Sequence, residues 1–391
     1  MKKNRRNRVL GAVAGAAGVL LASAMPSGAA PAPGAAPAPV VKEVPCETKA
    51  LLSAVSRVKG EKPHILKLAA KCTYTLTTAK TMQPGMTVKG KDLTIEGNGA
   101  TIRWAGAADK AVMNIAESAR VTMQDLTVSG GKAGGIWVGM FSGITEEQRP
   151  RLTLRNVHVT GNSDSGRGAG INVRNGTLIA HDSRIDHNTI PSSRSACGAG
   201  VDISPRGQVV LSGTTVVTAN TSYGEHLRVG RRDEFSAGHG GGICIYRGSL
   251  IMKDTAAVTG NTAKPDTPPN FALDKIGDTG LGGGIYNLGG TVLLEDQASI
   301  TGNTAHKGGG IYNTSHTIQG SPTGSGYDFN PYGGTHTGTV TLSGQAAVTG
   351  NTAYQGGGIY NDGSVKTTGS AKIESNTPSN CAGPAVTGCT G

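Results

Sequence analysis

The stretch Gly-Gly-Gly-Ile-Tyr-Asn decides the fold: it stands at residues 282–287 and returns at 308–313 and 356–361. Looser copies of this glycine-led motif lie at 134–138, 168–173, 198–203 and 240–245. A second motif, Val-Thr-Gly-Asn-Thr-Ala, occupies 258–263 and 348–353, with a near-identical copy at 300–305. Internal repetition of this kind indicates a solenoid, in which each repeat forms one layer that packs on the next.

Between the two motifs lies a third short segment rich in β-branched residues, such as Thr291–Leu294, which favours a strand. No helical period of apolar residues is sustained, so a helical solenoid is excluded. The Asn-Gly and Asp-Gly hairpin signals of a propeller are sparse. The sequence therefore predicts an all-β, right-handed parallel β-helix with three short strands per coil.

An asparagine recurs in each copy of the second motif, and degenerate copies keep it. The set comprises Asn162, Asn188, Asn220, Asn261, Asn303, Asn351 and Asn376. In a stack of coils these side chains would align and satisfy buried hydrogen-bonding groups, so we interpret them as structural. Their spacing varies from 25 to 48 residues, which predicts a short minimal coil with loop insertions.

The opening segments Cys72–Thr77 and Leu93–Ile102 resemble the first coils of secreted β-helix repeat proteins of actinobacteria. The glycine-led motifs are similar, more distantly, to the repeats of chlamydial polymorphic outer-membrane proteins. These elements resemble the pectin-lyase-like superfamily of right-handed β-helices, and the likeness to the secreted family covers nearly the whole mature chain. The resemblance implies that the glycine-led strand belongs to the sheet whose outer face carries substrates and catalytic groups.

The chain divides into four predicted parts. Residues 1–29 have a basic start, an apolar run and small residues, which is typical of a secretory signal peptide. Residues 30–45 are a Pro/Ala-rich linker, residues 46–380 the β-helix, and residues 381–391 a C-terminal disulfide cap. We expect a secreted, extracellular and monomeric protein with no transmembrane segment in its mature part.

Six cysteines in an exported chain are expected to be largely oxidised. Pairs Cys46–Cys72 and Cys381–Cys389 would staple the two ends of the solenoid. Cys197 and Cys244 remain for each other, but the repeat alignment offsets them by about five residues, roughly 16 Å along a strand. That span exceeds the reach of a disulfide, so the third pairing stays open.

Charge limits the class of partner. Removing the five basic residues of the leader from 37 Lys and Arg leaves 32 against 26 acidic residues, a net charge of about +6 for the mature chain. No block of basic residues interleaved with aromatics exists there, so a nucleic-acid partner is not expected. Extracellular polysaccharide or cell-surface glycan is the expected partner.

In each glycine-led strand the Ile or Val points inward, so the next residue points outward. The resulting outward row is Trp137, Asn172, Asp202, Cys244, Tyr286, Tyr312 and Tyr360. Trp137, Asn172 and the three tyrosines are the predicted binding residues. The tyrosine rings could stack on sugar faces, or they could form an aromatic ladder that stabilises the sheet, which is the favoured reading.

Asp202, with Arg174 and Arg206 nearby in sequence, is the candidate catalytic group of a lyase, epimerase or hydrolase. Because Asp202 lacks a second carboxylate on the row, as a hydrolase would need, we interpret it as solvated surface charge. No metal or cofactor is predicted, and calcium is expected only for a lyase. The sequence favours a secreted binding protein for extracellular polysaccharide over an enzyme of the superfamily, although fold alone establishes neither.

Overall fold

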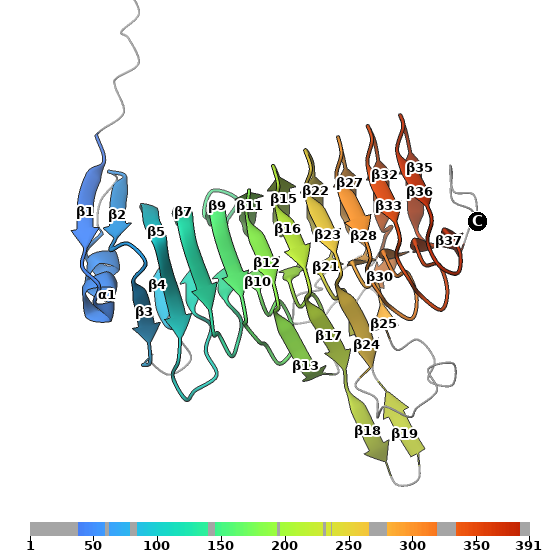
Figure 1. Ribbon diagram of the computed structural model, residues 1–391, viewed down its shortest axis with the longest axis horizontal. Coiled ribbons are helices and arrows are strands. Elements are labelled where there is room, and N and C mark those ends of the chain that lie inside the picture. Colours follow the sequence, from blue (N-terminus) through green and yellow to red (C-terminus); the bar gives the residue numbers. More distant parts are fainter. Residues whose placement is uncertain are drawn as a thin grey trace, which may run out of the picture. The chain divides into compact units, whose positions relative to one another are not determined.

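The protein is represented by a computed structural model that describes residues 38–58, 62–78, 84–139, 145–193, 196–229, 232–235, 237–265, 280–318 and 334–383. The predicted signal peptide and Cys389 lie outside these ranges. Within them the chain forms a right-handed parallel β-helix, with successive coils stacked side by side (Figure 1). The predicted fold class is confirmed.

The seven glycine-led motifs lie in one parallel sheet of ten strands, which we call the glycine-led sheet. Its strands, in chain order, are β4 (Met86–Val88), β6 (Met113–Ile115), β8 (Ile136–Val138), β10 (Ile171–Val173), β14 (Val201–Ile203), β21 (Ile243–Tyr246), β26 (Ile285–Leu288), β29 (Ile311–Thr314), β34 (Ile359–Asp362) and β37 (Cys381–Ala382). Each strand is in register with the same motif of the next coil, so equivalent residues form straight rows.

The other two strands of each coil belong to one 18-stranded sheet, because β5 (Asp92–Trp104), β7 (Arg120–Ser129) and β9 (Arg151–Thr160) run through both positions. One position holds β1 (Val40–Val44), β2 (His64–Leu68), β11 (Thr177–His181), β15 (Gln208–Ser212), β22 (Ser249–Met252), β27 (Thr291–Leu294), β32 (Thr339–Leu342) and β35 (Ser364–Thr367). The other holds β3 (Thr73–Leu76), β12 (Arg184–Asp186), β16 (Val216–Thr218), β23 (Ala257–Thr259), β28 (Ser299–Thr301), β33 (Ala347–Thr349) and β36 (Lys372–Glu374).

Insertions add short strands outside the coils. Three of them, β13 (Thr189–Ser193), β17 (Thr221–Gly224) and β24 (Thr262–Pro265), form a parallel sheet that continues from the asparagine turns. The remaining pairs are β20 (Gly238–His239) with β25 (Gly280–Leu281), β18 (His226–Val229) with β19 (Arg232–Phe235), and β30 (His316–Ile318) with β31 (Gly334–His336). Figure 1 shows the β18–β19 hairpin extending beyond β17.

The core runs along the inside of the coils. Inward residues of the glycine-led sheet, such as Ile285, Ile311 and Ile359, are completely buried and lie directly over one another. Alternate residues of the other strands do the same, as the burial pattern of β32 shows. Alternate residues of each strand therefore point inward, and their apolar side chains stack from coil to coil into one continuous core.

The recurrent asparagines form the predicted structural ladder along one corner of the coils. The Nδ2 of each of the first six donates to the Oδ1 of the next, at 2.9–3.0 Å from Asn162 through Asn376. The backbone N–H of each also donates to that same oxygen, as Asn261 does to Asn303 at 2.9 Å. Asn380 ends the ladder by accepting from Asn376 Nδ2 at 3.2 Å. All seven are buried, so the ladder satisfies amides that water does not reach.

Folded structure begins earlier than predicted. Strand β1 lies inside the segment interpreted as linker and pairs with β2 over five residues, because Val40–Val44 is rich in β-branched side chains. The sequence also gave no sign of helix α1 (Thr48–Arg57), which buries Leu51, Ala54 and Val55 against the first coils. The helix covers the open end of the core, as a solenoid end requires.

Two disulfides lie within the described ranges. The predicted Cys46–Cys72 bridge is confirmed, with its Cα atoms 5.6 Å apart. Cys197 and Cys244 are also bridged, with their Cα atoms 5.4 Å apart, so the expected 16 Å separation was wrong. The chain does not run straight through the motif, because Gly198 has a φ of +69° and turns it back on itself. Cys381 is not free, and its predicted partner Cys389 lies beyond the described residues.

Candidate functional site

The seven residues of the predicted outward row do lie in one row across the glycine-led sheet. Strand register joins Trp137 to Asn172, Asn172 to Asp202, and so on through Cys244 to Tyr360. Asn114 extends the row at one end. The row is therefore one continuous feature on the outer side of the sheet, with one residue from every coil from β6 to β34.

A second row lies against the first. The residue directly before each glycine-led motif pairs in register with its equivalent in the next coil. This pre-glycine row consists of Arg167, Cys197, His239, Leu281, Lys307 and Gln355. The turn that brings it back is tight: a Cβ at Gly198 would lie 2.3 Å from the carbonyl oxygen of Val201, so only glycine fits there.

Pre-glycine residues contact the outward residue of the following coil. Cys197 is bonded to Cys244, and the His239 ring lies 4.6 Å from the Tyr286 ring, measured between centroids. Lys307 Nζ lies 5.1 Å from the ring centroid of Tyr360. The pre-glycine row therefore covers the outward row, and the candidate site lies between the two.

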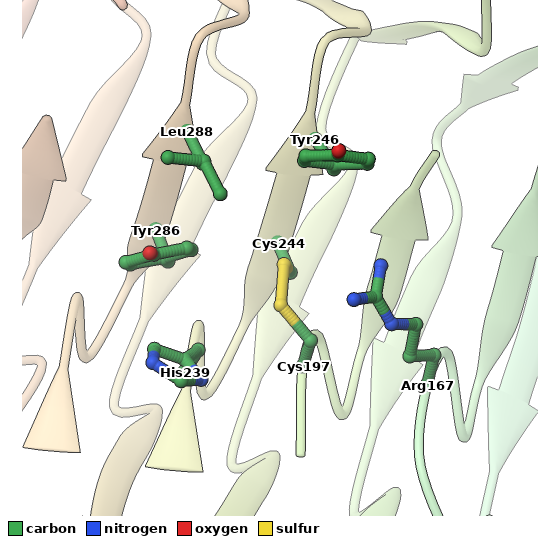
Figure 2. A pocket seen from close by; sticks show the side chains of 7 residues that line it. All are labelled: Arg167, Cys197, His239, Cys244, Tyr246, Tyr286 and Leu288. Carbon is green, nitrogen blue, oxygen red and sulfur yellow. A yellow bond between two sulfur atoms is a disulfide. The ribbon is translucent and has the colours of Figure 1, made fainter. Parts of the chain in front are cut away.

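A pocket of about 180 Å³ opens between these rows in the middle coils. Its walls are formed by Arg167, Cys197, His239, Cys244, Tyr246, Tyr286 and Leu288. Figure 2 shows the disulfide in its centre, with Arg167 on one side and the His239–Tyr286 pair on the other. The Arg167 guanidinium carbon is 5.8 Å from the Tyr246 ring centroid, close enough for a cation–π contact. The pocket thus combines one cation, aromatic rings and an apolar floor.

Asp202 lies on the outward row next to Cys244 but is completely buried, so the interpretation of it as solvated charge was wrong. The sequence did not predict this burial, and a carboxylate oxygen of Asp202 lies within 4.8 Å of the Cys197 and Cys244 sulfurs. Ser204 Oγ donates to Asp202 Oδ2 at 2.5 Å, while Oδ1 has no hydrogen-bond partner among the described residues.

Burial raises the pKa of Asp202 to about 6, against the opposing effects of the Arg167 charge and the Ser204 hydrogen bond. Arg174, the predicted catalytic partner, also acts to lower this pKa, so it is electrostatically coupled to Asp202. The charge of Asp164 raises it further, so Asp202 is not the lone carboxylate of this region.

Asp164 has a local structural role. Its Oδ1 accepts hydrogen bonds from the backbone N–H groups of Gly166 and Arg167, at 2.7 and 2.8 Å. These bonds fix the turn that carries Arg167 to the edge of the pocket. Burial raises the pKa of Asp164, although the same two backbone bonds oppose the rise.

His239 is neutral in this site. Burial lowers its pKa to about 4, and the Arg167 charge lowers it further. Its Nδ1 lies 3.2 Å from the carbonyl oxygen of Ala196, which only accepts, so Nδ1 carries the proton and Nε2 keeps a lone pair. Burial also raises the pKa of Tyr286 to about 12, so its phenol stays protonated.

The tyrosines of the outward row stack on one another. Tyr312 lies between Tyr286 and Tyr360, with ring centroids 5.5 and 5.1 Å apart and interplanar angles of 16° and 1°. Both faces of the Tyr312 ring are therefore occupied by protein. The geometry is that of the aromatic ladder, so ring edges and hydroxyls are what this part of the row offers a ligand.

The remaining predicted site residues lie apart from the pocket. Trp137 is half-buried on β8, between Asn114 and Asn172 in the row. Asn172 is buried, and its Nδ2 donates to the Arg167 carbonyl at 3.3 Å. Arg206 is exposed in the turn after β14, with a φ of +61°. Sequence reasoning gave Arg167, one of the charges near Asp202, no role at the site and did not single out His239, although both directly precede a glycine-led motif.

One segment of the chain matches the model of a known repeat family. The model of the Chlamydia polymorphic membrane protein repeat matches residues 297–314, which include the asparagine turn after β28 and strand β29. The chain is a parallel β-helix repeat protein. A search of curated proteins and a search of solved structures each found no match. The likeness to the pectin-lyase-like superfamily stays a prediction.

Two further observations bear on where the protein works. Its disulfides fit an oxidising compartment, since thiols are kept reduced in the cytosol. Among the residues that the structure describes, no helix has the length and apolar character needed to cross a bilayer.

Proposed function

We propose that the protein is exported and binds extracellular polysaccharide along the outward and pre-glycine rows, from the pocket at Arg167 to β34. The pocket at Arg167, Tyr246 and Tyr286 is the observation that carries this proposal, because it opens directly beside the tyrosine ladder. A chain held in the pocket by one unit can continue along the ladder.

The spacing of the rows supports a polymeric ligand. Equivalent residues of neighbouring coils repeat at the strand separation of about 4.8 Å, and Tyr286, Tyr312 and Tyr360 occupy three such positions in succession. A polymer with a short chemical repeat can make the same contact on each coil. A compact ligand would use only one of them.

The chemistry of the rows supports a sugar. Phenol hydroxyls, a neutral imidazole and the guanidinium of Arg167 offer donors and acceptors to a hydroxyl-rich ligand, while Leu288 and the disulfide give it an apolar surface. The contacts expected of the ladder are with ring edges and hydroxyls, because the ring faces stack on one another. This differs from the face-stacking mode that the sequence suggested as one possibility.

The test is affinity electrophoresis and calorimetry of the full chain on a panel of neutral and acidic polysaccharides. We expect Arg167→Ala and Tyr312→Ala each to weaken binding of the selected polysaccharide by at least about tenfold, or about 1.4 kcal/mol. Tyr223→Ala is the matched control, since Tyr223 also makes a cation–π contact, with Lys264, but lies on β17 outside the rows. Binding by no member of the panel, or equal binding by all three variants, would refute the proposal.

A polysaccharide lyase, epimerase or hydrolase is the second candidate. The observation that favours it is a carboxyl with a pKa of about 6 coupled to Arg167 and Arg174, since such groups serve as general acids or bases. The complete burial of Asp202 speaks against it, because a substrate must reach the group that takes its proton. Turnover of a polysaccharide that Asp202→Asn abolishes, with folding and binding retained, would establish the enzyme.

A further inference from the structure

We infer that reduction of the Cys197–Cys244 disulfide creates a binding site for a thiophilic divalent cation such as Zn²⁺, with Cys197, Cys244 and Asp202 as its ligands. The site opens into the pocket proposed for polysaccharide, but metal binding does not depend on polysaccharide binding. In the oxidised protein the two sulfurs are bonded to each other, so the site exists only in the reduced form.

Geometry brings the three ligands together from two rows. Asp202 and Cys244 are register partners on adjacent strands and both point outward, while Cys197 approaches from the pre-glycine row. One ligand atom of each lies within 4.8 Å of the others. Two thiolates and one carboxylate oxygen are ligands that zinc accepts in a tetrahedral site, with water from the pocket in the fourth position.

The second observation is the state of Asp202. Its side chain is completely buried, yet Oδ1 has no hydrogen-bond donor among the described residues. A buried carboxylate oxygen without a partner is costly, and coordination to a cation removes that cost. A carboxylate oxygen of Asp202 already lies within 4.8 Å of both sulfurs, so the carboxylate needs no large movement to become a ligand.

Charge around the cluster suits a bound dication. Two thiolates and one carboxylate carry three negative charges, which leaves one negative charge after Zn²⁺ binds. Arg167 and Arg174 both interact electrostatically with Asp202 and would balance that remaining charge. The arginines thus prevent accumulation of negative charge in a buried site.

The pocket gives access to the reaction. Both cysteines line it, and Cys197 retains 6% exposure, so a small dithiol can reach a sulfur. The dithiol attacks the disulfide and leaves as its own oxidised disulfide, and the two electrons and two protons it gives up convert Cys197 and Cys244 to thiols. Zn²⁺ then displaces both thiol protons and binds the two thiolates, with any proton on Asp202 also released.

The other described disulfide provides a contrast within the same chain. Cys46 and Cys72 bridge the first coil to the segment before α1, and they belong to no described cluster of three metal-ligating side chains. Reduction of that pair is therefore expected to give ordinary thiols. The two disulfides differ because only Cys197 and Cys244 are grouped with a carboxylate, that of Asp202, among the described residues.

The experiment uses the full chain reduced with a non-thiol phosphine, to which Co²⁺ is added as a spectroscopic substitute for Zn²⁺. We expect one Co²⁺ per chain with a thiolate-to-cobalt charge-transfer band, and no such band in the oxidised chain. Asp202→Asn should weaken binding at least about tenfold, since loss even of a side chain that only supports a ligand costs about 10–100-fold.

Cys197→Ala combined with Cys244→Ala retains the other cysteines and should remove the band. Because this variant lacks a cross-link, its fold is checked by circular dichroism. X-ray absorption of the unsubstituted, reduced and zinc-loaded chain gives a measurement free of substitutions: two sulfurs at about 2.3 Å and oxygen ligands at about 2.0–2.2 Å are expected. A band that persists in the double variant, affinity unchanged in Asp202→Asn, or an absence of sulfur ligands would overturn the inference.

Discussion

Two rows of side chains pass through the same coils and follow opposite rules. In the asparagine ladder the residue is the same at seven successive coils, from Asn162 to Asn376, and each amide bonds to the next. In the outward row of the glycine-led sheet the residue changes from asparagine to aspartate, cysteine and tyrosine within a few coils. Backbone register is equally regular in both.

The difference follows from what surrounds each row. A ladder amide is buried, and its partners are the neighbouring asparagines and nearby backbone carbonyls, so a change in one coil leaves groups unsatisfied in two others. The outward row meets a second row and the pocket, so each coil can use a different side chain. Uniformity therefore marks the structural row, and variation marks the row where binding chemistry can be built.

The largest test removes the covalent link between the outward and pre-glycine rows. The Cys197–Cys244 bridge closes a loop with a sequence separation of 47, so Cys197→Ala with Cys244→Ala is expected to lower the free energy of unfolding by about 4 kcal/mol. Urea unfolding of the oxidised proteins measures the change. A loss below about 1 kcal/mol would show that the glycine turns alone hold the rows together.

The next test removes one amide from the asparagine ladder. Asn261→Ala removes the acceptor of two bonds from Asn220 and a donor to Val217, so we expect a loss of about 3 kcal/mol in the free energy of unfolding. Lys253→Ala, at an exposed position of the same coil, is the control and should change stability by less than about 0.5 kcal/mol. Similar losses in both variants would contradict the ladder's role.

A third test follows the titration of Asp202 in the outward row. The pKa of Asp202 is about 6 in the folded chain against 3.8 as its ordinary value, so the folded state retains a proton that the unfolded state loses. This carboxyl therefore costs stability as pH rises from about 4 to 6. We expect Asp202→Asn to gain about 2 to 3 kcal/mol of stability relative to the unsubstituted protein between pH 4 and pH 8. The free energy of unfolding of both proteins is measured against pH. A difference between them that stays constant across this range would be inconsistent with a buried, titrating Asp202.

The smallest expected effect is on the tyrosine ladder. Tyr312→Ala removes two stacked pairs and should reduce the free energy of unfolding by about 1 to 2 kcal/mol, while Tyr312→Phe keeps the stacking and should cost less. Thermal and urea unfolding compare the two. Equal losses would assign the stabilisation to the hydroxyl instead of to the stacked rings.

The fold and the outward row were predictable because both depend on register alone. Ile285, Ile311 and Ile359 repeat in the same motif, and once parallel coils stack, the residue after each must form a row. The ladder asparagines were predictable for the same reason. Helix α1 was not, since ten residues at one end give too little periodicity to stand out from a β-rich chain.

The burial of Asp202 and the Cys197–Cys244 bridge could not be read from that register. The bridge depends on the positive φ of Gly198, and the pre-glycine row as a whole depends on equivalent turns that bring the chain back over the sheet. A glycine in sequence permits such a conformation without requiring it. The pocket could not be predicted for the same reason. Arg167 and His239 line it only because the chain turns at Gly168 and Gly240, which also have positive φ.

The asparagine ladder has a direction: each Nδ2 points toward the later coil and each Oδ1 toward the earlier one. Any coil can therefore follow any other through the same amide junction. Deleting Asn261 through Gly302, a full repeat of 42 residues, would place Asn303 where Asn261 stood and leave Asn220 with an equivalent acceptor. Duplication or loss of whole coils is thus compatible with the ladder, so the length of such a protein can change over evolution in steps of one coil.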